Sequence, residues 1–329
     1  MRTLFVSAVV VALLTGSAHA QSAGADDTEA GASDASTACD QGSVGPGADA
    51  ATLSSSADAI AAVAASPPPV PDMTLTFDDE FNTASISDDN FANGTNWSDH
   101  LWFTDPRPEL FSVANGVVSI TADQNPATNA DGFVGQMATV NEKGKGFAQR
   151  FGYFEASIKV PGGKGTWPSF YLVNNDRLTV DPDILESEID VMEAPGVLFE
   201  TYLATLHADS FFFNKDDVTN AADNRVPTGV DLSQDFHRYG VLWDPNSPTI
   251  DWYFDGQKVL TSQKFSTTDG SPMMVVLGSS VGDFGLGGND VDPSTPNPAV
   301  MQVDWVHVYQ FNPLLASMTL AAMPVGSCP

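Results

Sequence analysis

From residue 72 onward, the chain consists of short segments rich in Val, Ile, Phe, Tyr and Trp, separated by Gly, Asn, Asp and Pro. No long helical period appears before the C-terminal tail. Two of the breaks, Asn115-Gly116 and Asp255-Gly256, have the composition of tight hairpin turns. Short strands joined by such turns are typical of antiparallel sandwiches and jelly rolls. We therefore predict an all-β fold.

Residues 188–193 read Glu-Ile-Asp-Val-Met-Glu, which places three carboxylates among strand-forming apolar residues. Strict alternation puts Glu188 and Asp190 on one face of the strand and turns Glu193 to the other. One extra residue, a β-bulge near Met192, would return Glu193 to the first face. Because carboxylates are rarely buried without partners, three in one strand indicate a function.

Two glutamates with an aspartate between them suit retaining glycoside hydrolysis, which needs two carboxyl groups about 5–5.5 Å apart. We assign Glu188 as the nucleophile, Glu193 as the general acid/base, and Asp190 as the residue that tunes the pKa. Its like charge and its hydrogen bonds would separate the pKa values of the other two. Taken alone, the six residues fit an acidic strand edge or a calcium site equally well.

The flanking segments favour catalysis. In order along the chain, the Glu-x-Asp-x-x-Glu strand and its neighbours resemble glycoside hydrolase family 16, the laminarinase-like β-glucanases, over residues 72–311. The matching neighbours are segments 77–82, 152–159, 165–172, 236–243, 252–256 and 303–309. The resemblance implies a concanavalin-like β-jelly-roll sandwich of two curved antiparallel sheets, with a cleft across the concave face.

The same resemblance implies a secreted endo-acting hydrolase that cleaves β-1,3- or mixed β-1,3/1,4-glucan by double displacement. Three alternatives stay open on the same fold: a transglycosylase, a hydrolase that processes exopolysaccharide, and a carbohydrate-binding protein without turnover. The bulged spacing resembles the hydrolase branch, and pure binding does not need both glutamates.

Several residues are expected to contact substrate. In the family, the tryptophan at the position of Trp167 lines the cleft, although core packing would explain Trp167 too. A histidine at the position of His207 often lies near the acid/base in the family. Arg107 resembles a family arginine near the glucan subsites, although a surface ion pair would explain it too. Tyr171 stands where many relatives have a second tryptophan, and Ser187 stands where glycine is common. Both departures bear on the substrate more than on the reaction.

An early loop that contains Trp97, His100 and Trp102 could also border the cleft, and we include Trp102 among the expected substrate contacts. The resemblance implies no cofactor for catalysis. It does suggest a structural calcium on the convex face, held by Glu80, the carbonyl of Gly116 and Asp304, and oxygen ligands of this kind suit calcium.

The N-terminus reads Arg2, an apolar run at Leu4–Leu14, and the small-residue site Ala18-His19-Ala20. This pattern predicts a secretory signal peptide at residues 1–20. Residues 21–71 are rich in Ala, Ser, Gly and Asp, and we interpret them as a disordered linker. A catalytic domain at 72–312 and a tail at 313–329 complete the chain. Cys39 and Cys328 either form a disulfide between linker and tail or remain free thiols, and their spacing excludes the usual zinc patterns.

The chain is strongly acidic, with 42 acidic and 13 basic residues and a formal net charge of −29. Seven of the acids lie in residues 21–71, so most of the charge belongs to the predicted catalytic domain. Such a charge repels nucleic acid, anionic membranes and strongly anionic polysaccharides. We therefore expect a neutral polysaccharide as partner, no nucleic acid or membrane partner, and a monomer.

Overall fold

The computed structural model describes residue 68 and residues 71–312, except 88–94, 102–104, 123–134, 175–186, 209–217, 220–223, 266–267 and 284–285. The predicted signal peptide, nearly all of the predicted linker, the C-terminal tail and both cysteines lie outside the described residues. The domain boundaries proposed from the sequence therefore stay predictions.

The described residues form two β-sheets. The eight strands of the first sheet are β1 (Met73–Asp79), β4 (Phe111–Ala114), β5 (Val117–Ala122), β7 (Gly152–Lys159), β13 (His237–Trp243), β14 (Thr249–Phe254), β15 (Gln257–Gln263) and β17 (Ala299–Phe311). The nine strands of the second are β2 (Ile86–Ser87), β3 (Trp97–Ser98), β6 (Gly135–Ala138), β8 (Thr166–Asn174), β9 (Ser187–Glu193), β10 (Thr201–Ala208), β11 (Val218–Thr219), β12 (Arg225–Pro227) and β16 (Met273–Val281). Two short 3-10 helices accompany them, η1 (Pro108–Leu110) and η3 (Gly196–Leu198).

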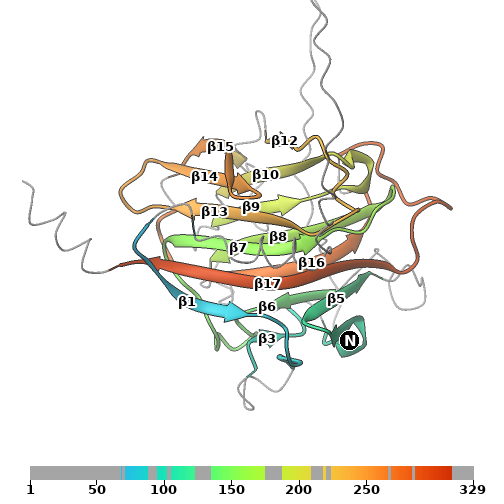
Figure 1. Cartoon of the computed structure of the whole chain (residues 1–329), viewed down its shortest axis with the longest axis horizontal. Coiled ribbons are helices and arrows are strands. Elements are labelled where there is room, and N and C mark those ends of the chain that lie inside the picture. Colours follow the sequence, from blue (N-terminus) through green and yellow to red (C-terminus); the bar gives the residue numbers. More distant parts are fainter. Residues whose placement is uncertain are drawn as a thin grey trace, which may run out of the picture. The chain divides into compact units, whose positions relative to one another are not determined.

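The first sheet has the order β15-β14-β13-β7-β17-β5-β4, with β1 paired to β17. The second has the order β11-β10-β9-β8-β16-β6-β3-β2, with β12 paired to β10. The described pairings are antiparallel apart from β2 with β3. Figure 1 shows the two sheets as layers, and the predicted all-β sandwich is confirmed. Both predicted hairpin turns are confirmed as well, since Asn115-Gly116 joins β4 to β5 and Asp255-Gly256 joins β14 to β15.

The core lies between the sheets, because each strand turns alternate side chains inward. In β7 the buried apolar residues are Phe154, Ala156 and Ile158, and in β8 they are Phe170 and Leu172. Together with side chains from β13, β16 and β17 they form one continuous cluster. This packing fixes the second sheet rigidly against the first, so side chains on its other face are held in register.

The other face of the second sheet has an apolar cluster of its own. It consists of Leu101, Ala138, Val140, Tyr171, Val173, Met274 and Val276. These residues come from β6, β8, β16 and the loops beside them, and they adjoin the strand that carries the three carboxylates. The strand with the carboxylates is therefore supported by apolar packing on both faces of the second sheet.

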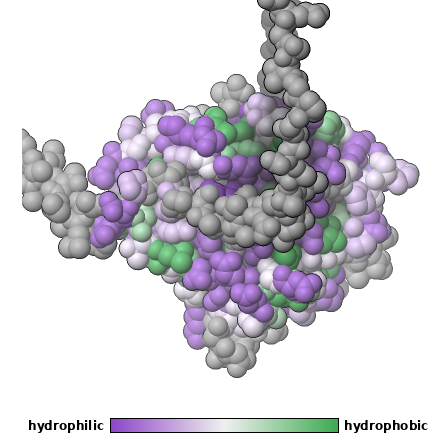
Figure 2. Space-filling view, in the orientation of Figure 1, coloured by the Kyte–Doolittle hydropathy of each residue, from purple (hydrophilic) through white to green (hydrophobic). Residues whose placement is uncertain are grey.

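In the orientation of Figure 2, the described surface is mainly hydrophilic, with small separate hydrophobic areas. Across the whole described surface, the large apolar side chains that are exposed are scattered, and Phe199 is the most exposed at 57%. None of the described helices has the length and apolar character of a membrane span.

Candidate active site

The three carboxylates of β9 lie on one face because the strand contains a bulge. Against β10, Asp190 pairs with Thr205 and Glu193 with Leu203, so three steps on β9 match two on β10. Against β8, Asp190 pairs with Tyr171 and Met192 with Phe170, which leaves Val191 as the extra residue. Val191 and Met192 both point into the core, so Glu193 returns to the side of Glu188 and Asp190. The predicted bulge near Met192 is confirmed.

We call this side of the second sheet the carboxylate face. The registers place His207 opposite Glu188 on β10, and Tyr171 opposite Asp190 on β8. Ser169 of β8 pairs with Glu193 of β9 on one side and with Gly278 of β16 on the other. A polar row thus runs across the sheet through Glu193, and the apolar cluster around Tyr171 lies next to it.

Each carboxylate has partners that fix its position. The indole Nε1 of Trp167 donates a hydrogen bond of 2.8 Å to Oε1 of Glu193. The Nε2 atom of His207 lies 2.9 Å from Oδ2 of Asp190. Asp190 also shares a hydrogen bond with Glu188. One carboxylate oxygen each from Glu188 and Asp190 and one imidazole nitrogen of His207 all lie within 4.8 Å of one another. Two carboxyl groups in such contact need one proton between them, which couples their titrations.

The surroundings raise the pKa values of two of these carboxyl groups. Burial raises the pKa of Glu193, and the negative charge of Glu188 raises it further, against the opposing effects of the Trp167 hydrogen bond and His207. Burial also raises the pKa of Asp190, followed by the charge of Glu193, while His207 and Glu188 lower it. The charge and hydrogen bonds of Asp190 were expected to separate the pKa values of the two glutamates. For Glu193 the largest cause is burial, and the like charge that raises its pKa is that of Glu188.

The sequence-predicted substrate residues fall into two groups. Trp167 bonds to Glu193, His207 bonds to Asp190, and Tyr171 pairs with Asp190 across the strands. Trp167 and Tyr171 are only 3% and 4% exposed, and substrate contact by these three residues stays a prediction. Arg107 precedes η1 and donates to Glu109, as the surface ion-pair alternative supposed. Trp102 lies outside the described residues.

The early loop differs from its prediction at one residue. Trp97 is fully buried in the main core, where its indole donates to Oδ2 of Asp79, so it does not border the carboxylate face. A large aromatic ring gains more from burial than from exposure when its N–H finds an acceptor, and Asp79 supplies one. His100 is buried too and lies 2.7 Å from the carboxylate of Asp99.

Sequence reasoning gave no role to Trp252, a residue of β14 in the other sheet. Its indole Nε1 donates a 2.8 Å hydrogen bond to the backbone carbonyl of Asp190. At a bulge the backbone leaves the ordinary ladder, so a carbonyl there needs another donor. The local sequence around Trp252 contains no signal for this contact, because it depends on how the two sheets stack.

The three residues predicted to hold calcium come together at a different place. A side chain at Gly116 would lie 3.6 Å from the carbonyl oxygen of Glu80 and 3.9 Å from Oδ1 of Asn82. Asp304 is the extra residue of a bulge in β17, and its pKa is raised by burial and by the charge of Glu80. His307 forms a 2.6 Å contact with the Glu80 carboxylate. Carboxylates and carbonyls on three separate segments fit a hard cation such as calcium.

The arrangement on β9 can therefore perform acid–base and nucleophilic chemistry within one strand. Glu193 is a carboxyl group with a raised pKa, an indole donor and partial exposure. Glu188, five residues before it on the same face, is also partly exposed. Such a pair, with unequal environments, can divide the roles of proton donor and attacking group.

Comparison with known protein families assigns most of the chain. Residues 73–311 match the profile described as the glycoside hydrolase family 16 domain of β-porphyranases A–D. Among curated proteins, the endo-1,3-1,4-beta-glycanase EglC of Rhizobium meliloti is 30% identical over 267 residues, which cover 73% of this chain and 52% of that protein. A beta-glucanase of Rhodothermus marinus is 28% identical over 261 residues, covering 73% of this chain and 86% of that protein.

Solved structures agree with the fold. The endo-beta-1,3-glucanase of Pyrococcus furiosus is 25% identical, with a TM-score of 0.53, and the match covers 74% of this chain and 99% of that one. The laminarinase catalytic domain of Thermotoga maritima has a TM-score of 0.55 at 22% identity, which speaks for the fold alone. The chain spans about half the length of its Rhizobium meliloti relatives.

Proposed function

Because this chain belongs to glycoside hydrolase family 16, we propose that it is an endo-acting hydrolase of β-1,3- or mixed β-1,3/1,4-glucan that retains anomeric configuration. The observation that carries the proposal is the bulged strand β9, which brings Glu188, Asp190 and Glu193 to one face. Curated relatives named as endo-β-glucanases support the reaction class.

The mechanism follows from the environments of the two glutamates. Glu193, whose pKa is raised by burial, holds a proton and donates it to the departing glycosidic oxygen. Glu188 attacks the anomeric carbon from the opposite side and forms a glycosyl-enzyme. Glu193, now ionised, then takes a proton from water as the water attacks the intermediate. The Trp167 hydrogen bond stabilises this ionised form.

Asp190 and His207 complete the proton arrangement. Asp190 is almost fully buried and contacts both Glu188 and His207. While Glu188 is ionised, a proton between it and Asp190 prevents repulsion between the two carboxyl groups. When Glu188 becomes the ester, it loses its negative charge, and that repulsion no longer exists. With the shared proton on Asp190, Glu188 stays ionised as the nucleophile until it becomes the ester, and Glu193 alone gives up and regains a proton.

The substrate class is argued from charge. The family profile is named for β-porphyranases, whereas the relatives above are named as an endo-1,3-1,4-beta-glycanase and a beta-glucanase. The strong negative charge of the chain disfavours polyanionic polymers, and a neutral glucan carries no such penalty.

The proposal predicts that the purified protein releases new reducing ends from laminarin or lichenan, and far fewer from porphyran, agarose or carboxymethylcellulose. The assay measures reducing sugar against time on all five polymers, with the Glu188→Gln variant as the blank. The laminarin-to-lichenan ratio indicates the linkage, and product lengths over time separate hydrolysis from transfer to another sugar. Preferential release from porphyran or agarose would overturn the glucan assignment.

We also propose a structural calcium ion held by Glu80, the carbonyl oxygen of Gly116 and Asp304. The convergence of these residues supports it. An ion that binds only the folded state stabilises it, by about 2.7 kcal/mol at a concentration 100 times its Kd. Calcium should therefore raise the melting temperature. Calorimetry with CaCl₂ and with EGTA tests this, with MgCl₂ as the matched ion. The Asp304→Asn variant should lose the calcium response, and equal melting temperatures in CaCl₂ and EGTA would contradict the proposal.

Export and a monomeric state are further parts of the proposal. Export rests on residues 1–20. The monomeric state and the lack of nucleic-acid or membrane partners rest on the strong negative charge, which repels like-charged molecules. No cofactor enters the proposed reaction, since two carboxyl groups supply all of its proton transfers and its nucleophile.

A further inference from the structure

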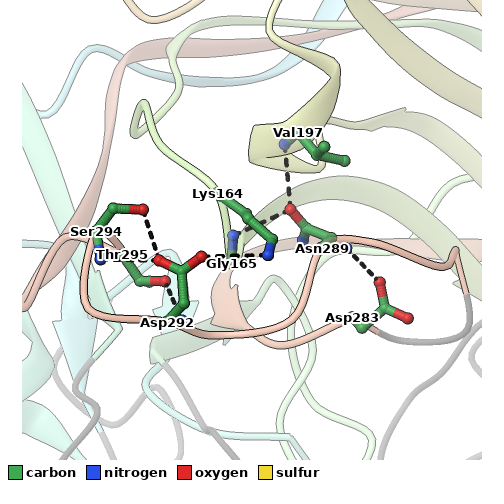
Figure 3. Close-up of polar contacts among 8 residues, drawn as sticks. All are labelled: Lys164, Gly165, Val197, Asp283, Asn289, Asp292, Ser294 and Thr295. Carbon is green, nitrogen blue, oxygen red and sulfur yellow. Dashed lines mark hydrogen bonds and ion pairs between the residues drawn. The ribbon is translucent and has the colours of Figure 1, made fainter.

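The loop between β16 and β17 contains a completely buried asparagine, Asn289, whose amide forms four hydrogen bonds. Its Oδ1 atom accepts from the backbone N–H of Gly165 at 3.0 Å and of Val197 at 3.1 Å. Its Nδ2 atom donates to the carbonyl of Thr166 at 3.1 Å and to the carbonyl of Gly282 at 2.8 Å. One side-chain amide thus uses both of its donors and both acceptor positions. Figure 3 shows it between Gly165 and Val197.

These bonds join the two segments that flank the acid/base pair. Gly165 and Thr166 come directly before Trp167 in the chain, and Val197 lies in η3, four residues after Glu193. Trp167 in turn donates to Glu193. Asn289 therefore connects the backbone just before Trp167 to the backbone just after Glu193.

The segments also approach too closely for side chains to intervene. A Cβ atom at Gly196 in η3 would lie 1.8 Å from the carbonyl oxygen of Gly163, and one at Gly165 would lie 2.4 Å from Oγ1 of Thr295. Only glycine permits such contacts. The turn before β8, η3 and the β16–β17 loop are thus packed backbone to backbone, with the Asn289 amide between them.

The loop itself is held from its exposed side by a second set of contacts. Asp283 accepts from the backbone N–H of Asn289 at 2.7 Å, and Asp292 accepts from Lys164 Nζ at 3.1 Å. Ser294 donates to Asp292 as well, and Thr295 accepts from its backbone N–H. Figure 3 shows the contact of Asp292 with Lys164 beside the contacts that Asn289 makes with Gly165 and Val197.

We propose that Asn289 is a positioning residue that holds the Trp167 indole against the carboxylate of Glu193. No other side-chain type of this size offers two donors and two acceptor positions in one plane. Removing it would leave two N–H groups and two carbonyls unpaired in a buried place, and the chain would have to move to satisfy them. Trp167 is the second residue of β8, and the turn that leads into it at Gly165 is the segment that Asn289 holds, whereas β9 is fixed between β8 and β10.

The consequence for Glu193 follows from the groups around it. The side chains whose charges or bonds act on it are Glu188 and Asp190 of β9, His207 of β10 and Trp167 of β8. Of these, only Trp167 depends on Asn289 for its position. Because its hydrogen bond lowers the pKa of Glu193, displacing the indole should raise that pKa.

The test measures the titration of Glu193 directly, by carbon-13 NMR of the glutamate carboxyl groups, with the signal assigned by its loss in Glu193→Gln. In Asn289→Ala the midpoint should rise by about one pH unit, the effect expected for a lost hydrogen bond to a charged group. Trp167→Phe should give a rise of the same size. Asn289→Ser keeps one hydroxyl that can bond; it should shift the midpoint less, and it substitutes for the alanine variant if that one does not fold.

The matched control is Asp292→Asn, which weakens the attachment of the same loop to the same turn at a half-buried position. Its Glu193 midpoint should equal that of the parent protein. An unchanged midpoint in both Asn289 variants, or an equal shift in Asp292→Asn, would overturn the inference. The link to catalysis rests on the proposed function: if that holds, the alkaline limb of kcat/KM moves with the midpoint. If no polymer is hydrolysed, the NMR titration still decides the role of Asn289.

Discussion

Replacing Glu188 with alanine should reduce hydrolysis of laminarin or lichenan by about 10⁴-fold or more, and added azide should restore cleavage of an activated aryl β-glucoside with inversion. Without the carboxylate, no group remains to attack the anomeric carbon. Azide is small enough to occupy the vacated position and attack from the same side, and this single displacement yields the α-glycosyl azide.

The Glu193→Ala variant is the matched control for this assignment. There the glycosyl-enzyme still forms on Glu188 when the leaving group needs no proton, and azide then attacks the opposite face. The product is the β-glycosyl azide, with retention. Proton NMR of the anomeric hydrogen distinguishes the two products. A β-azide from Glu188→Ala, or full polymer hydrolysis by that variant, would show that Glu188 is not the nucleophile.

Much of the frame of this site could be predicted from the chain itself. The alternation of Ile189 and Val191 against three acids specified a strand with a functional face, and the family spacing required a bulge. The registers place the bulge at Val191 and Met192, as the spacing predicted. A bulge can sit at either of two adjacent residues with the same outcome for Glu193, and only the packing of Val191 and Met192 into the core decides between them.

Contacts between distant segments could not be predicted in the same way. Trp252 reaches the carbonyl of Asp190 from the other sheet, and Asn289 reaches Gly165 from 124 positions away. Both depend on how loops and layers meet, and neither has a local periodicity or a spacing that signals it. Trp97 shows the opposite error: its place beside His100 suggested a cleft loop, yet the acceptor at Asp79 keeps it in the core.

Replacing Glu193 with glutamine should slow hydrolysis of glucan by about 10²- to 10⁴-fold, the usual contribution of a general acid/base. The same variant should be more stable than the parent protein at neutral pH. Glutamine keeps an oxygen that can accept from Trp167, so that contact survives. What disappears is a carboxyl group that must lose its proton in a buried place as the pH rises.

The direction of this stability change with pH follows from the link between proton binding and folding. Burial raises the pKa of Glu193 in the folded protein, so between the unfolded and folded pKa values the folded state binds more protons. The unfolding free energy of the parent therefore falls as the pH rises through this window, by about 1.4 kcal/mol for each unit of separation. The variant does not titrate there. Its advantage should be absent near pH 4 and complete above the folded-state pKa of Glu193.

Urea unfolding of both proteins at pH 4, 6 and 8 measures this difference. Glu109→Gln is the matched control, because Glu109 is exposed and its hydrogen bond with Arg107 lowers its pKa. Its effect should have the opposite sign, a small loss of stability that appears as the pH rises and vanishes in acid. If Glu193→Gln were inactive but its stability advantage over the parent protein were no larger at pH 8 than at pH 4, the raised pKa of Glu193 would be wrong. Its part as proton donor at neutral pH would then need another cause, because a carboxyl group of ordinary pKa has already lost its proton there.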